Sequence, residues 1–529
     1  MKKNTTFFSH HLNARLSVRL LAIALLTLTT NAIAHTIHAP VGRILGTKSG
    51  AISLYQGIPY AQPPVGKLRW AAPEQVKPFT HLFKADGSGN ECVQKAVYWR
   101  PDKPASWKED CLTLNVYVPN SRRHDMPVIV GFHGGGSVNG SKSDWDPREL
   151  AEAGNIIVTV NYRLGAMGYL ALNELNTESK NGSSSGNYGD LDKIEALRWV
   201  KNNISAFGGN PQRVTIAGQS AGARAVCFLV ASPEAKGLFQ GAIIESGRDC
   251  QSVPNEQAVK TGDKFVEAIG CNDSKDKLAC LRSKTPSEVL DAQTKSKFSL
   301  TTVSGVPAQP KATLEAFRAG EFNHVPMIVG NTRDETRLFV YAANDMVDQP
   351  VDKAQYENEV RTRMGEKATA TFAAYASDAR KSPGLALGSL DADQTYICPA
   401  SVAIEALAKW TTVYAYEFSD VTAPISTFTT IPSSFDIGIP HSAELPYIWG
   451  EKIVPNRLTK EQEKLAKTMR GFWGSLTSRG GPKGPVIWPV WSESSPQRII
   501  FKAGGKTQIM KESDYRKLHH CGLFTTQAR

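Results

Sequence analysis

The sequence predicts an α/β fold in which helices cover both faces of a large, mostly parallel central sheet. Short apolar runs of the kind that form buried strands recur along the chain. Between two of them, apolar residues repeat at steps of three or four from Leu191 to Ile204, which marks an amphipathic helix. Strands that alternate with helices in this way favour a parallel sheet. The apolar runs are 127–132, 156–160, 214–217, 242–244, 326–329 and 413–416.

The sequence also predicts antiparallel strands near the N-terminus and several loops. Residues 43–60 alternate polar and apolar side chains, which is typical of antiparallel strands. Stretches rich in Gly, Ser, Thr or Pro predict loops, and none has the composition of an interdomain linker. We therefore expect residues 35–529 to form one domain with inserted loops and helices. The predicted loops are 181–186, 382–388, 421–434 and 479–485.

The N-terminus has the pattern of a secretory signal peptide. Basic residues precede the apolar run 20–28, and the small residues of Asn31-Ala32-Ile33-Ala34 follow it. We expect cleavage after Ala34, with residues 1–34 removed and the mature protein delivered to the periplasm or the medium. The apolar run is shorter than the ~20 residues of a spanning helix, and no later stretch replaces it, so no membrane span is expected.

The charge of the chain argues against a nucleic-acid partner. The formal net charge is +11, and residues 1–34 carry four basic and no acidic residues, which leaves +7 on the mature chain. Lys and Arg are interleaved with Asp and Glu, and no RNP-like or helix-turn-helix pattern is present. This composition favours solubility over nucleic-acid binding.

All eight cysteines follow the predicted signal, so in an oxidising compartment they are interpreted first as disulfides. Cys271 and Cys280 bracket a short polar segment that a disulfide would close. A metal site is the alternative, but the chain has no Cys-x-x-Cys pair, and histidines stand beside a cysteine only in His519-His520-Cys521. Adjacent residues rarely point at one ion. We expect that cluster to be structural, with no metal or other cofactor.

The strongest local motif is Gly218-Gln219-Ser220-Ala221-Gly222, between the strand 214–217 and the helical run 223–230. A sharp strand-to-helix turn of this kind exposes the serine hydroxyl, and the flanking glycines permit close approach of neighbouring chains. The motif predicts Ser220 as a nucleophile in an α/β-hydrolase fold.

A second motif supplies the hydrogen-bond donors that a reaction at such a nucleophile needs. His133-Gly134-Gly135-Gly136 follows the strand 127–132, and consecutive glycines let backbone N–H groups face a substrate oxygen that becomes negative. No Gly-Lys-Ser/Thr follows, which excludes a phosphate-binding loop.

The histidine that takes the serine proton follows the nucleophile in this fold, with the supporting acid between the two. His324 leaves little chain for an acid, and His519 and His520 lie near the terminus. His441, in the loop Gly438-Ile439-Pro440-His441, is therefore the predicted general base.

Two carboxylates, Asp334 and Glu335, follow the strand 326–329 and are candidates for the acid. Side chains of adjacent residues point in different directions, so one of the two has another role. The spacing by itself does not choose between them.

Together these motifs resemble the type B carboxylesterase family, which includes cholinesterases and bacterial para-nitrobenzyl esterases. The resemblance extends over most of the mature chain. The matching motifs are Gly57-Ile58-Pro59-Tyr60-Ala61, Pro63-Pro64-Val65-Gly66, Glu109-Asp110-Cys111-Leu112-Thr113-Leu114-Asn115-Val116, the glycine triplet, Asn161-Tyr162-Arg163, Gly186-Asn187-Tyr188-Gly189, the serine motif, Asp334-Glu335, His441 and Trp488-Pro489.

The resemblance implies a serine esterase that acts on small-molecule esters. It implies Glu335 as the acid and Ser246 as a residue that supports this glutamate. It also implies an oxyanion hole formed by the backbone N–H groups of Gly135, Gly136 and Ala221. The disulfides that it implies are Cys92–Cys111, Cys271–Cys280 and Cys398–Cys521, whereas Cys227 and Cys250 have no counterpart in the pattern and either pair with each other or stay reduced.

The chain also departs from the family. Many members carry a glutamate where this chain has Gln219 and a bulky residue where it has Ser137. Trp99 and Trp107 lie between Cys92 and Cys111, and neither aligns securely with the tryptophan by which cholinesterases bind a cation. Cholinesterase activity is therefore not implied.

Other functions share this fold. Lipases, thioesterases and hydrolases of amides or carbamates use the same triad. The neuroligins, which lack the catalytic serine, are adhesion proteins, whereas this chain has every catalytic part. The acyl group, the alcohol and the oligomeric state stay open.

Overall fold

The fold is described from a computed structural model. The predicted signal peptide lies almost wholly outside the described residues, as do parts of three predicted loops. In the part of the chain that the structure describes, no helix is both long and apolar enough to cross a membrane. The described residues are 33–100, 102–120, 124–179, 185–248, 250–298, 300–425, 431–450, 457–478 and 481–524.

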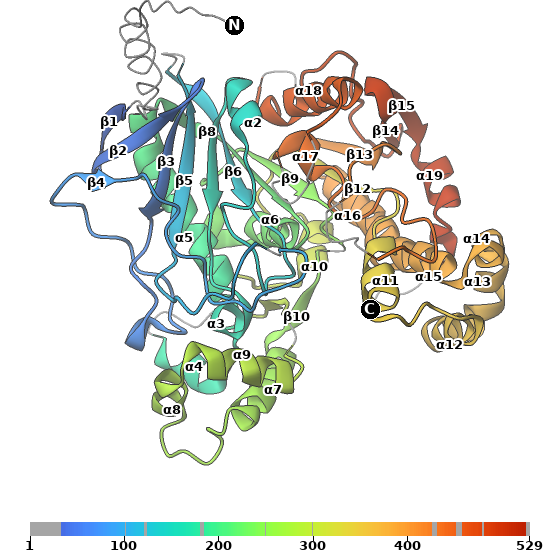
Figure 1. The fold of residues 1–529 in the computed structure, drawn as a ribbon, viewed down its shortest axis with the longest axis horizontal. Helices are drawn as coiled ribbons and strands as arrows, with labels where there is room; N and C mark the ends of the chain where they lie inside the picture. The colour runs from blue at the N-terminus through green and yellow to red at the C-terminus, as the bar shows by residue number, and fades with distance from the viewer. Residues whose placement is uncertain are drawn as a thin grey trace, which may run out of the picture.

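One large sheet runs through the molecule (Figure 1). Within the described ranges its 13 strands are β1 (Ile33–Ala39), β2 (Gly42–Ser49), β3 (Ile52–Pro59), β4 (Phe83–Lys84), β5 (Thr113–Pro119), β6 (Met126–Phe132), β7 (Ile156–Val160), β8 (Gly209–Gln219), β9 (Gly241–Glu245), β12 (Met327–Thr332), β13 (Val413–Ser419), β14 (Gln497–Lys502) and β15 (Lys506–Lys511). A separate two-stranded sheet joins β10 (Ser252–Pro254) to β11 (Thr302–Ser304).

The strand order is β1-β2-β3-β5-β7-β6-β8-β9-β12-β13-β14-β15, and β4 pairs with β2. Every pairing from β7 to β14 is parallel. The pairings between consecutive strands from β1 to β7, and that of β14 with β15, are antiparallel. The predicted α/β-hydrolase fold with a mostly parallel sheet is therefore confirmed, and each of the six apolar runs lies in or overlaps a strand of its parallel part.

Helices cover both faces of the sheet because alternate strand residues point to opposite sides. In β6, Val128 and Val130 pack into one apolar core and Ile129 into the other. The first core includes residues of α5 (Tyr188–Asn203), α6 (Ala221–Ala231), α10 (Thr313–Ala319) and α16 (Cys398–Ala408). The second includes residues of α2 (Arg148–Glu152), α17 (Leu445–Ile448) and α18 (Lys460–Gly474).

Further helices are inserted around the sheet (Figure 1). Between β9 and β12 lie α7 (Asn255–Ala268), α8 (Lys277–Ser283) and α9 (Pro286–Lys295), near α3 (Gly165–Tyr169) and α4 (Asn173–Glu178). Between β12 and β13 lie α11 (Arg337–Ala343), α12 (Lys353–Met364), α13 (Ala368–Ala374), α14 (Ala376–Lys381) and α15 (Pro383–Ala392). The helix α19 (Glu512–Leu518) follows β15.

The prediction of a loop at 382–388 is wrong, because this segment is the first half of α15. Pro383 occupies the start of the helix, where a fixed φ and a missing N–H are tolerated. Leu385, Leu387 and Leu390 are buried in a separate apolar core that the inserted helices share. Tertiary packing thus overrides the loop-like composition.

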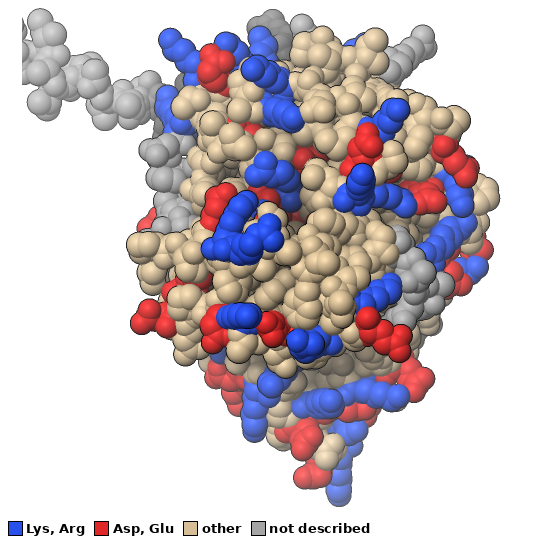
Figure 2. All heavy atoms as spheres, turned by 90° about the vertical axis from the view of Figure 1, so that its right-hand side faces the viewer, with Lys and Arg blue, Asp and Glu red and all other residues tan. Residues whose placement is uncertain are grey.

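Basic and acidic side chains are interspersed on the outer surface. Figure 2 shows one face of the molecule, on which Lys and Arg lie among Asp and Glu with uncharged residues between them. Charges of one sign do not gather into a continuous patch on this face.

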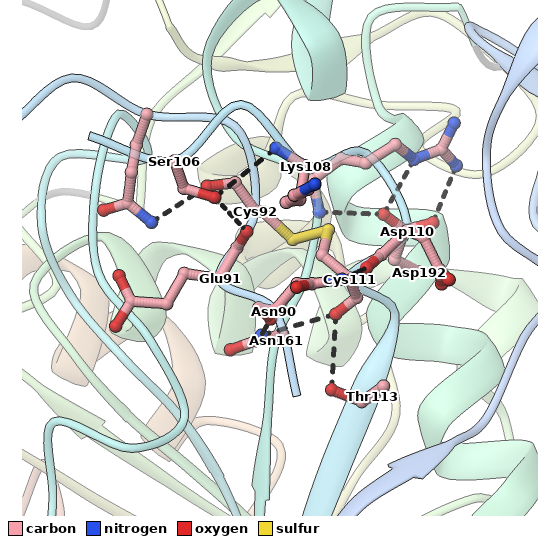
Figure 3. The surroundings of a disulfide bond; sticks show 12 residues. Asn90, Glu91, Cys92, Ser106, Lys108, Asp110, Cys111, Thr113, Asn161 and Asp192 are labelled. Carbon is pink, nitrogen blue, oxygen red and sulfur yellow. Dashed lines mark hydrogen bonds and ion pairs between the residues drawn. A yellow bond between two sulfur atoms is a disulfide. The ribbon is translucent and has the colours of Figure 1, made fainter. Parts of the chain in front are cut away.

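The structure contains the three disulfides that the resemblance implied and a fourth between the two unassigned cysteines. Figure 3 shows the bond between Cys92 and Cys111, beside which the Asn161 amide donates to the Asn90 and Cys111 carbonyl oxygens at 2.9 and 3.3 Å. The disulfides are Cys92–Cys111, Cys227–Cys250, Cys271–Cys280 and Cys398–Cys521.

His519, beside the last of these disulfides, is buried between two carboxylates. Its Nδ1 lies 2.7 Å from Asp393 Oδ1, and its Nε2 lies 3.2 Å from Glu417 Oε2. Burial by itself lowers the pKa of His519, but the two carboxylates outweigh burial and raise it to about 9. The charged imidazolium therefore joins the end of the chain to β13.

We expect this cluster to make stability depend on pH. The pKa of His519 in the folded protein lies above its unfolded value of about 6.5. Its contribution to the free energy of unfolding is therefore complete below about pH 6.5 and is lost as the pH rises through 9. The loss amounts to about 3 kcal/mol of unfolding free energy. Urea unfolding between pH 6 and pH 10 should show this slope in the native protein and in the exposed control His324→Gln. A slope of equal size in His519→Gln would contradict the assignment.

Candidate active site

Ser220 occupies a strained turn between β8 and α6. Its φ of 59° and ψ of −120° are unusual for a residue with a side chain. The surrounding backbone holds this conformation, since the Ser220 N–H donates to the Glu245 carbonyl oxygen at 2.9 Å. The turn leaves the serine partly accessible at the end of a central strand.

The glycines beside Ser220 are required because three backbones meet there. A Cβ atom on Gly218 would overlap the backbone of Gly222, and one on Gly222 would overlap the carbonyl oxygen of Phe132. This contact joins the ends of β6 and β8 to the first turn of α6. The strand-to-helix turn that the sequence predicted is therefore present.

The glycine-rich segment after β6 lies against this turn. A Cβ atom on Gly134 would lie 3.1 Å from that of Ser220, and Gly135 and Gly136 have φ values of 94° and 63°. Gly135 and Gly136 line the same cavity as Ser220. Ala221 directly follows the serine as the first residue of α6.

His133 anchors this segment. Its ring stacks on Tyr162 with centroids 4.4 Å apart, and the Tyr162 hydroxyl donates to the His133 carbonyl oxygen at 2.6 Å. Burial lowers the pKa of His133 to about 3, so its imidazole is neutral near pH 7. The ring therefore brings no positive charge to the glycine segment.

His441 and Glu335 form a close pair. The distance from His441 Nδ1 to Glu335 Oε2 is 2.5 Å, and the carboxylate is fully buried. The other oxygen, Oε1, accepts hydrogen bonds from the Ser246 hydroxyl at 2.5 Å and the Thr332 N–H at 2.9 Å. Three donors from separate segments therefore hold this carboxylate in one orientation.

The structure separates the roles of the two adjacent carboxylates. Asp334 does not contact the imidazole but accepts from the Ile439 N–H at 2.8 Å and pairs with Arg337 at 2.9 Å. It therefore fastens the loop that carries His441. Glu335 contacts the ring itself.

The other nitrogen of His441 contacts Gln219. The Gln219 amide nitrogen lies 3.1 Å from His441 Nε2 and 3.0 Å from Ser442 Oγ. Among the described residues, Ser220 makes no hydrogen bond to His441. Gln219 therefore contacts the same ring nitrogen that would accept a proton from Ser220. A hydrogen bond between a nucleophile and its base commonly forms or shortens only when substrate is bound.

Two more carboxyl groups lie near the Glu335–His441 pair, and the sequence reasoning missed them. Glu245 accepts from the indole N–H groups of Trp473 and Trp449 at 2.7 and 3.0 Å, and burial raises its pKa to about 7. Glu444 is fully buried, and neither of its oxygens has a hydrogen-bond partner in the part of the chain described here. Burial, together with Glu335 and Glu245, disfavours the charged form and raises the pKa of Glu444 well above the usual range.

These elements surround a cavity of about 400 Å³. Ser220, His441, Gly135 and Gly136 line it together with aromatic side chains. Of the two tryptophans that the sequence left open, Trp99 lines the cavity, whereas Trp107 is exposed and does not line it. The other aromatic residues are Tyr98, Trp145, Phe339 and Tyr396.

Three arginines in the cavity wall were also missed: Arg100, Arg224 and Arg248. For two of them the sequence holds a signal, because Arg224 follows Ser220 by one helical turn and Arg248 follows Ser246 by two residues. Within the described ranges, no group of three or more His, Cys, Asp or Glu side chains is placed to hold a metal ion.

Comparison with known proteins places this geometry among esterases. A model of the carboxylesterase family matches residues 33–518. The para-nitrobenzyl esterase of Bacillus subtilis is 30% identical over 494 residues, which cover 90% of this chain and 96% of that protein. The acetylcholinesterase of Bungarus fasciatus is 31% identical over 504 residues, covering 87% and 80%. A solved PNB esterase superposes with a TM-score of 0.76 at 28% identity, covering 92% of this chain and 99% of its own.

Proposed function

Because this chain belongs to the carboxylesterase family and is a carboxylic-ester hydrolase, we propose that it cleaves its substrates through an acyl-enzyme on Ser220. The observation that carries the proposal is the Glu335–His441 pair, which lies at the cavity that Ser220 also lines. We assign His441 as general base and Glu335 as the acid that orients it.

The reaction begins when substrate enters and His441 Nε2 turns from Gln219 to the Ser220 hydroxyl. The imidazole takes the proton as Ser220 Oγ attacks the ester carbonyl carbon. Glu335, held by Ser246 and Thr332, stabilises the imidazolium that forms. The imidazolium then protonates the departing alcohol, and water releases the acid from Ser220 by the same steps.

The negative oxygen of each tetrahedral intermediate accepts hydrogen bonds from backbone N–H groups. We assign this oxyanion hole to Gly135, Gly136 and Ala221. Donors that are fixed in advance stabilise the developing charge without reorganisation, and one such donor is commonly worth a factor of about 10² to 10³ in rate.

We also propose that the protein is exported and that residues 35–529 act as one catalytic domain. The basic and apolar pattern of residues 1–34 and four disulfides support export to the periplasm or the medium.

An organophosphate should label Ser220 stoichiometrically, because the activated hydroxyl attacks phosphorus as it attacks an ester carbonyl. Intact mass followed by peptide mapping measures the site. Ser246→Ala, which removes a neighbouring hydroxyl, should still be labelled, whereas Ser220→Ala should not. Labelling of another serine would refute the assignment.

A further inference from the structure

The cavity beside Ser220 is lined by two arginines that have no acidic partner among the described residues. Its lining includes three arginines, Arg100, Arg224 and Arg248, and a single acid, Asp144. Arg100 is neutralised, since it pairs with Asp144 at 2.7 Å and with Glu91 at 3.0 Å. Among the described residues, Arg224 and Arg248 have no carboxylate within ion-pair distance.

Arg224 stands close to the nucleophile. It lies on α6 four residues after Ser220, one helical turn further on and on the same side of the helix. Its guanidinium makes one long hydrogen bond, 3.4 Å from Nη1 to the Leu300 carbonyl oxygen. Among the described residues this guanidinium makes no other hydrogen bond, so its remaining N–H groups can bind a ligand.

Arg248 stands on the histidine side of the cavity. Its Nε is buried and has no hydrogen-bond partner within the described residues. Its guanidinium carbon lies 5.5 Å from the centre of the Tyr396 ring, which is 5.2 Å from the ring of His441. The residue also has a φ of 59°, so the turn after β9 holds it in an unfavourable backbone conformation.

Other arginines of this chain show what a sheltered guanidinium normally requires. Arg163 pairs with Asp192 at 2.6 Å, and Arg498 pairs with Glu512 at 2.5 Å. Arg224 and Arg248 are partly buried, and a guanidinium that is partly withdrawn from water is stabilised by such a partner. The face in Figure 2 mixes both signs of charge, whereas two arginines of the cavity have no carboxylate partner in the part of the chain that the structure describes. The missing acid can come from the substrate.

We propose that the enzyme selects esters that carry a free carboxylate, either on the acyl part, as in half-esters of dicarboxylic acids, or on the alcohol part, as in esters of hydroxy acids. The planar guanidinium binds a carboxylate through two parallel hydrogen bonds. A cavity of about 400 Å³ suits a small substrate of this kind. This inference rests on the proposed function of Ser220.

Matched pairs of esters test the proposal. For the acyl side, the para-nitrophenyl monoester of adipic acid is compared with the para-nitrophenyl ester of a neutral acid that ends in an isopropyl group of the same shape. For the alcohol side, the acetate of para-hydroxybenzoate is compared with that of para-isopropylphenol. In at least one pair we expect kcat/KM to be about tenfold or more higher for the anionic ester, and the preference should weaken with added salt.

The variants Arg224→Gln and Arg248→Gln, singly and together, should reduce that ratio, by about tenfold in the double variant, with neutral esters still cleaved. Arg361→Gln removes the same charge from an exposed side chain of α12 that does not line the cavity, and it should leave the ratio unchanged. Equal kcat/KM for both members of both pairs, or an unchanged ratio in the double variant, would overturn the proposal.

Inhibition of the unsubstituted protein tests the same point without any variant. The monoanilide of adipic acid should inhibit neutral-ester hydrolysis about tenfold more tightly than the anilide of the branched neutral acid, and equal inhibition would contradict the proposal. If neutral esters are cleaved by Ser220 without anionic preference, this inference alone fails. If their cleavage does not depend on Ser220, the proposed function fails.

Discussion

Replacing Ser220 with alanine should abolish esterase activity and preserve the fold. Without the hydroxyl no acyl-enzyme forms, and removal of such a nucleophile lowers kcat by about 10⁶. Alanine tolerates the strained turn about as well as serine does, because the unfavourable φ of 59° arises from the backbone and Cβ. Steady-state kinetics with a neutral para-nitrophenyl ester measure the loss, and thermal unfolding checks the fold.

Ser246→Ala is the matched control for this change. Its hydroxyl donates to Glu335 and takes no part in bond formation in the proposed mechanism. Removing one hydrogen bond to a charged group costs about 1.5–3 kcal/mol, so we expect a loss of about 10 to 100-fold. Near-native turnover by Ser220→Ala would rule out the proposed nucleophile.

Replacing His441 with alanine should cost nearly as much as the loss of the serine, about 10⁶ in kcat, because the two residues act as one unit. Glu335→Gln should cost less, about 10⁴, since the imidazole remains and loses only its orienting charge. The 2.5 Å contact between Glu335 and His441 Nδ1 is the basis for this order. Single-turnover kinetics at one pH provide the comparison.

His324→Ala is the matched control for the histidine change. His324 is exposed and does not line the cavity, so its loss should leave kcat unchanged. An unaltered rate in His441→Ala would contradict the proposed mechanism, as would a greater loss in Glu335→Gln than in His441→Ala.

The sequence by itself determined the central strands, the serine turn and the order of the candidate triad. Buried strands and the serine turn can be predicted from the residues of a short segment, and the order of the triad follows from the order of these segments along the chain. A strand at the edge of a sheet has a weaker sequence pattern. The strands β14 and β15 were not predicted, and β15, which is the edge strand, is polar along most of its length.

Only the tertiary structure decided which groups meet. It paired Cys227 with Cys250 and placed Trp99 but not Trp107 at the cavity, and it brought Glu335 to His441, a choice that the residue spacing had left open and only the family resemblance implied. It also showed that Arg224 and Arg248 have no carboxylate partner among the described residues and that Glu444 is buried. Contacts between residues often more than a hundred positions apart depend on how strands and loops pack, and no local pattern records those distances.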